Sequence, residues 1–154
     1  MARFKLIEDL EKTLYIFSLS DIHKKWTIAD IQRLVIPPLK LNQYRIYEDK
    51  ITPLCFASWA FLDAETAEGY AHNKTKIQTE DWNKGKVVWL VDVVAPYGGS
   101  INALLRLDNE RKEASKGQKG LGDGGGIAQG KDFRNIFYRR SLKKYSGARV
   151  SKRT

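Results

Sequence analysis

The stretch that decides the fold runs from Asp81 to Gly99 and reads DWNKGKVVWLVDVVAPYGG. Its centre, Val87 to Val94, is almost entirely β-branched and aromatic, which predicts a buried strand entered through a turn at 83–85. Asp92 is the one charge in this run, and a carboxylate in a buried strand is costly unless it is paired or hydrogen-bonded. Two interpretations stay open at this point. Asp92 either caps a nearby turn or serves a titratable partner elsewhere in the chain.

Helical and strand-like patterns alternate on both sides of this stretch. Apolar spacing by three and four predicts a first helix, and Thr27 with Asp30 predicts the capped start of a second, which Pro37 and Pro38 stop. Helices are expected at 4–17, 28–35, from 63 onward and at 101–114, and strands at 43–47, 53–61, 87–94, 133–138 and 145–150. This order predicts an α+β fold with a central, largely antiparallel sheet flanked by helices.

The length of 154 residues suits a single domain, 1–154. Residues 115–130 are rich in glycine, and we interpret them as a flexible insertion. Residues 120–125 formally fit G-x-G-x-x-G, but no strand pattern precedes them and no helix pattern follows, so we infer no nucleotide site. Residues 151–154 are expected to form a loose basic tail.

The net charge of +9 lies entirely in the last third of the chain, because residues 1–100 are neutral in sum. Such asymmetry indicates an acidic partner, whether nucleic acid, an anionic membrane surface or an acidic protein, or simply a solvated basic surface. We expect no transmembrane segment and no secretory leader. The single Cys55 is expected in the core and fits a cytoplasmic location, and one Cys with two His makes a zinc site unfavourable, so no metal is expected.

His23 is the residue best suited to proton transfer near neutral pH. A buried carboxylate would fix its tautomer and raise its basicity, and Asp92 is the acid that the strand has no packing reason to hold. A Ser-His-Asp hydrolase is a weaker alternative, because the chain has no Gly-x-Ser-x-Gly elbow, so Ser20 is interpreted as an orienting neighbour. His72 is interpreted as a helix-end residue.

Together these residues resemble a family, the RTX toxin-activating lysine acyltransferases, which activate haemolysins in Gram-negative bacteria. The similarity covers about residues 15–99 and rests on Ser20-x-x-His23-x-x-Trp26, Asn42-Gln43-Tyr44, Cys55-Phe56-Ala57-Ser58-Trp59-Ala60, Asp81-Trp82, Gly85, Trp89, Asp92 and Ala95-Pro96-Tyr97-Gly98. The resemblance implies a GNAT-like acyltransferase fold. It also implies that His23 and Asp92 form the catalytic pair, with Ser20 and Tyr70 in support. The chain departs from the family pattern at Asp21, Thr27, Val87 and Val93.

The resemblance further implies an enzyme of toxin activation, or haemolysin maturation. It would move a fatty acyl group from acyl-acyl carrier protein to an internal lysine of an RTX protoxin, with no bound cofactor, and it allows a homodimer. The acidic carrier would dock on Lys24, Lys25, Arg139 and Arg140. Two alternatives remain: a basic nucleic-acid-binding domain, although no specific nucleic-acid motif is visible, and a thioesterase-like hydrolase that uses the same pair with water as acceptor.

Overall fold

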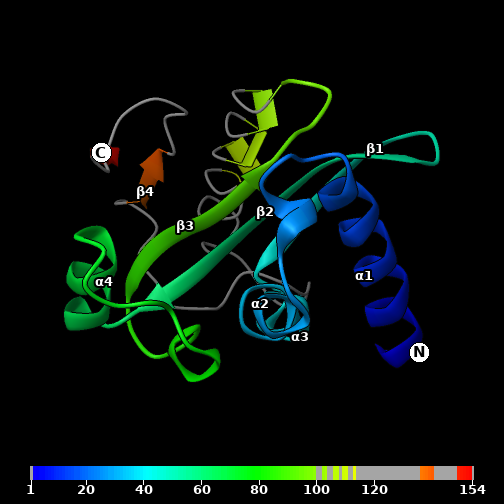
Figure 1. The fold of residues 1–154 in the computed structure, drawn as a ribbon. Helices are drawn as coiled ribbons and strands as arrows, with labels where there is room; N and C mark the ends of the chain where they lie inside the picture. The colour runs from blue at the N-terminus through cyan, green and yellow to red at the C-terminus, as the bar shows by residue number, and fades with distance from the viewer. Residues whose placement is uncertain are drawn as a thin grey trace.

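The computed structural model describes residues 2–99, 102–103, 106–107, 109–110, 113, 136–140 and 149–153. The elements are α1 (Ala2–Ser18), η1 (His23–Lys25), α2 (Ile28–Leu34), α3 (Ile36–Leu41), β1 (Tyr44–Asp49), β2 (Thr52–Leu62), α4 (Ala64–Ala71), η2 (Thr79–Asp81), β3 (Val87–Val94), β4 (Ile136–Arg140) and β5 (Arg149–Arg153). The described residues between 102 and 113 are helical. One sheet has the order β1-β2-β3-β4-β5, in which the β3–β4 pair is parallel and the other pairs are antiparallel. Figure 1 labels the first four of these strands. The predicted α+β class and largely antiparallel sheet are confirmed.

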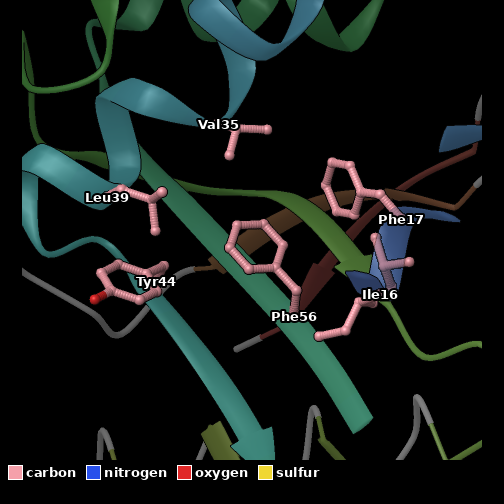
Figure 2. Packing of buried hydrophobic residues seen from close by; sticks show 7 residues of the cluster. Ile16, Phe17, Val35, Leu39, Tyr44 and Phe56 are labelled. Carbon is pink, nitrogen blue, oxygen red and sulfur yellow. The ribbon is translucent and has the colours of Figure 1, made fainter. Parts of the chain in front are cut away.

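Helices α1 to α4 pack on one face of the sheet. Phe56 of β2 lies at the centre of the first core cluster, with Ile16 and Phe17 of α1 on one side and Val35 and Leu39 from the α2–α3 region on the other (Figure 2). The same face of β2 continues into a second cluster, where Ala60 and Leu62 pack with Trp89 and with Ala67 and Ala71 of α4.

The opposite face of the sheet holds a third cluster. There Trp59, Phe61 and Val88 are buried, and Leu107, one of the described helical residues, packs against them. Successive residues of β2 therefore alternate between the two faces, as the pleat of a strand requires.

Strand β3 interrupts this alternation with a bulge. The β2–β3 register pairs Trp59 with Leu90 but Ser58 with Asp92, so Val91 is an extra residue in β3. Val87, Trp89 and Val91 pack on the helical side before the bulge, and Val94 packs there after it. With regular pairing, Val91 would stand opposite Ser58 and Asp92 would face the other side. The bulge therefore turns Asp92 toward the helices.

The structure corrects one prediction. Pro37 and Pro38 do follow the end of α2, but they lie in the first turn of a further helix, α3, where a proline costs no intrahelical hydrogen bond. Residues 151–153 belong to β5, which pairs with β4, within the stretch 151–154 where the sequence predicts a loose basic tail. The predicted glycine-rich insertion at 115–130 lies outside the described residues.

Candidate active site

His23 lies at the turn between the first two helices. Helix α1 ends at Ser18, and His23 opens the short η1. Trp26 is the C-cap of η1, and its backbone N–H donates to His23 O at 3.0 Å. The following helix begins at a capping box formed by Thr27 and Asp30, as predicted. This sequence of stop, turn and cap fixes the backbone around His23 from both sides.

Both ring nitrogens of His23 have partners. Nε2 lies 2.8 Å from Asp92 Oδ2, and Nδ1 lies 2.7 Å from Ser20 Oγ. Because a carboxylate can only accept, Nε2 carries the proton and donates it to Asp92, which leaves Nδ1 to accept from the Ser20 hydroxyl. The structure thus brings Ser20, His23 and Asp92 into one hydrogen-bonded chain. Of the two interpretations of Asp92, service to a titratable partner is the one that this contact supports.

The His23–Asp92 pair is shielded from water. The two side chains are 10% and 19% exposed. The His23 ring lies 4.6 Å from the ring of Phe17 and 4.6 Å from that of Trp26, and Phe17 in turn packs on Phe56 at 5.5 Å. A pair held against apolar rings interacts more strongly than an ion pair at the surface. The contact of Phe17 with His23 is not predicted from the sequence, where its position three residues before Ser20 is the only local sign of it.

The segments that carry the pair are also joined at the surface. The Tyr15 hydroxyl of α1 lies 2.8 Å from that of Tyr97, which follows β3. This hydrogen bond raises the pKa of Tyr97 above its ordinary value. Tyr97 belongs to the Ala95–Gly98 motif, and its contact with α1 depends on Tyr15, a distant residue that local sequence does not reveal.

The remaining predicted site residues lie in different places. Tyr70 belongs to the second core cluster, where its ring packs against Trp89 at 5.2 Å. Lys24 and Lys25 are exposed beside His23, and Lys24 pairs with Asp21 at 2.7 Å. Arg139 and Arg140 follow Tyr138, the β4 residue that pairs with Leu90, so in this parallel pair they run in the direction of Asp92.

Comparison with known proteins identifies the family of this chain. The model of the RTX toxin acyltransferase family matches residues 3–124. The chain belongs to this family. Similar curated proteins include an RTX-II toxin-activating lysine-acyltransferase of Actinobacillus pleuropneumoniae, 30% identical over 59% of this chain and 57% of the relative, and a protein-lysine myristoyltransferase of Kingella kingae, 30% identical over 60% and 55%. A protein-lysine palmitoyltransferase of Bordetella bronchiseptica is 31% identical over 75% of this chain and 63% of its own length. This RTX acyltransferase-family chain thus spans little more than half of the first two relatives.

Cys55 is a further titratable residue of this family member. Burial, and next the charge of Asp92, raise the pKa of Cys55 from 9.0 to about 11, so this buried residue is a thiol at neutral pH.

Within the described ranges, no group of three or more His, Cys, Asp and Glu side chains is arranged to hold a metal ion. None of the helices in the described part of the chain has both the length and the apolar composition needed to cross a bilayer.

Proposed function

We propose that this chain transfers a fatty acyl group from acyl-acyl carrier protein to a lysine ε-amine of an RTX protoxin. The observation that carries the proposal is the partly buried hydrogen-bonded chain Ser20–His23–Asp92, found in a member of a family whose relatives are named lysine acyltransferases. A GNAT-like arrangement is part of the proposal, and the mixed sheet covered by α1 to α4 on one face is compatible with it.

The acceptor lysine must first lose a proton. A free lysine ammonium has a pKa of ~10.4 and is not a nucleophile at neutral pH. His23 accepts the proton at Nδ1, because Nε2 is committed to Asp92. The Ser20 hydroxyl is hydrogen-bonded to His23 Nδ1, so it either relays the proton from the lysine to the ring or moves aside so that the amine contacts Nδ1 directly.

The deprotonated amine then attacks the thioester carbonyl. The C–N bond of the amide forms, the nitrogen loses its second proton to solvent, and the C–S bond to the carrier's prosthetic arm breaks. The thiolate takes up the proton that His23 received. Asp92 stays ionised throughout, and it stabilises the imidazolium and holds the ring in one orientation. The apolar rings of Phe17 and Trp26 exclude water, which would otherwise hydrolyse the thioester.

The same geometry permits a route through Ser20. Its Oγ would attack the thioester first, with His23 as base, and the lysine would then take the acyl group from the serine ester. Mass spectrometry of the chain after mixing with acyl-acyl carrier protein separates the routes. A stable mass increase on Ser20 in the absence of acceptor indicates the two-step route, and activity retained in Ser20→Ala indicates direct transfer.

The main experiment measures acylation of a protoxin lysine by purified native chain and by His23→Ala. We expect His23→Ala to abolish transfer while its circular dichroism spectrum stays native. Lys50→Ala, in the exposed turn between β1 and β2, is a surface control that should transfer at the native rate. Near-normal turnover by folded His23→Ala would show that His23 is not the base.

The thioesterase alternative uses the same three residues with water as acceptor, and the Ser20–His23 contact is the observation that favours it. An assay with acyl-acyl carrier protein and no protein acceptor decides between them. Release of free fatty acid at a rate unaffected by added protoxin supports the hydrolase. Slow release that gives way to amide formation when protoxin is added supports the transferase.

The carrier is proposed to dock on the basic residues near the pair, through Lys24, Lys25, Arg139 and Arg140. A positive surface steers an acidic partner, and this steering weakens as salt rises. We expect charge reversal of Lys24 with Lys25, or of Arg139 with Arg140, to weaken carrier binding. Reversal of Lys74 with Lys76, which lie after α4, serves as the matched control. A random RNA that outcompetes the carrier with a steep salt dependence would instead support the nucleic-acid alternative.

A further inference from the structure

Ser58 is a buried polar residue that the proposed chemistry leaves without a role. Its side chain is 0% exposed in the middle of β2, and its Oγ has no hydrogen-bond partner among the described residues. Its sequence neighbours Ala57 and Trp59 are buried and apolar. Burying a hydroxyl without a partner is unfavourable, and an alanine would fill nearly the same space without that cost. The hydroxyl at this position therefore requires an explanation.

The residue opposite Ser58 in the ladder is Asp92. The bulge at Val91 puts both side chains on the helical face of the sheet, and directly opposed residues in an antiparallel pair have Cβ atoms about 4.5–5.5 Å apart. The Ser58 Oγ is attached through one rotatable bond with three staggered positions. A change of rotamer is therefore sufficient to aim it at the Asp92 carboxylate.

The second carboxylate oxygen of Asp92, Oδ1, is available to accept a hydrogen bond. Within the described residues the one hydrogen bond of the Asp92 carboxylate joins Oδ2 to His23 Nε2 at 2.8 Å. The terminal torsion of an aspartate is broad, so a carboxylate held at one oxygen rocks about its Cβ–Cγ bond. A donor on Oδ1 would fix the plane of the carboxylate and keep Oδ2 directed at the ring.

We propose that Ser58 is a positioning residue: its hydroxyl donates to Asp92 Oδ1 and holds the carboxylate in line with His23 while the ring gains and returns its proton. Ser58 is fully buried and acts through Asp92. The kinetic consequence rests on the proposed acyl transfer, whereas the contact itself can be measured without turnover.

The kinetic test is a double-mutant cycle. We expect Ser58→Ala to lower kcat about tenfold with KM unchanged, which is the effect of about one well-placed hydrogen bond. In the Asp92→Asn background the same change should have no further effect, because the group through which it acts is already lost. Equal losses in both backgrounds, or no loss in the native background, would overturn the proposal.

The second test uses NMR of the His23 ring. The proton that Nε2 shares with Asp92 should change its resonance in Ser58→Ala. Thr13→Val is the matched control, since Thr13 is also 0% exposed but already donates to Asp9 O at 2.7 Å within α1, and it should leave the resonance in place. An unmoved resonance in Ser58→Ala, together with a raised melting temperature, would mean that the hydroxyl is merely unsatisfied, and the proposal fails. If the resonance moves but the native chain transfers no acyl group, Ser58 still positions Asp92 and it is the proposed function that fails.

Discussion

The hydroxyls of Tyr15 and Tyr97 form a 2.8 Å hydrogen bond that joins α1 to the segment after β3. His23 follows the first of these segments and Asp92 belongs to the strand that precedes the second. The Tyr15–Tyr97 hydrogen bond at the surface and the partly buried His23–Asp92 contact therefore join the same two parts of the chain.

The pH dependence of this link has a definite sign. Because the hydrogen bond to Tyr15 raises the pKa of Tyr97 above 10.0, its contribution to stability is complete below about pH 10 and is lost as pH rises through the folded-state value. Near-ultraviolet titration should therefore show that Tyr97 ionises late, and Tyr15→Phe should bring it back toward its ordinary pKa. Tyr47→Phe, a change in β1, is the control that should leave the Tyr97 titration in place.

Asp92→Asn should lower the transfer rate by about 10⁴, since loss of the orienting carboxylate in a Ser-His-Asp enzyme costs that factor. The amide keeps the shape but can present its N–H₂ to the ring, which reverses the tautomer of His23. Single-turnover rates measure the effect. Asp49→Asn, in an exposed position at the end of β1, is the matched control. A loss below about tenfold would demote Asp92 to a structural role.

Gly85→Ala should destabilise the fold far more than Gly98→Ala. A Cβ on Gly85 would lie 2.1 Å from Leu62 O and 2.4 Å from Asp63 N, both backbone atoms that cannot move away cheaply. Gly98 has open space around it, so its cost is limited to the positive φ of 88°. We expect a loss of about 3 kcal/mol or more at Gly85 and about 1 kcal/mol at Gly98, measured by denaturant unfolding. Similar values at both positions would contradict this packing.

Cys55 should resist alkylation in the native chain. Its thiol has a pKa of about 11 because of burial and the charge of Asp92, and the thiolate is the reactive form. Iodoacetamide at pH 8 should modify the native chain slowly and the urea-unfolded chain quickly. Since the folded pKa is raised, the stability that depends on this thiol is complete below about pH 9 and falls as pH rises toward 11. Cys55→Ala should flatten the alkaline part of the stability curve.

Local pattern was enough to predict most of the described elements. The three- and four-residue spacing gave α1, the Thr27–Asp30 pair gave the start of α2, and β-branched residues gave β3 with its observed bounds. The burial cost of a carboxylate also led from Asp92 to His23, a contact that spans 69 residues of sequence. These predictions succeeded because each depends on a local preference or on a single energetic conflict.

The features that were missed depend on tertiary structure. Nothing in the composition of β3 marks Val91 as an extra residue, because the bulge is set by pairing with β2 and not by a glycine. The prolines after α2 predict the end of a helix, and local sequence does not show that a new helix, α3, begins directly afterwards. Phe17 contacts His23, and Tyr97 contacts Tyr15, only because of the tertiary fold, so local sequence does not predict either contact.

The bulge in β3 has a consequence for protein engineering and for mutational scans. The strand carries two alternation phases: odd-numbered positions face the helices up to Val91, and even-numbered positions face them from Asp92 onward. A library built on one uninterrupted phase would randomise Asp92 together with residues of the opposite face. Both faces of the strand are buried before the bulge, with Trp89 in the second cluster and Val88 in the third, so a design must assign residues to the two faces separately on each side of Val91.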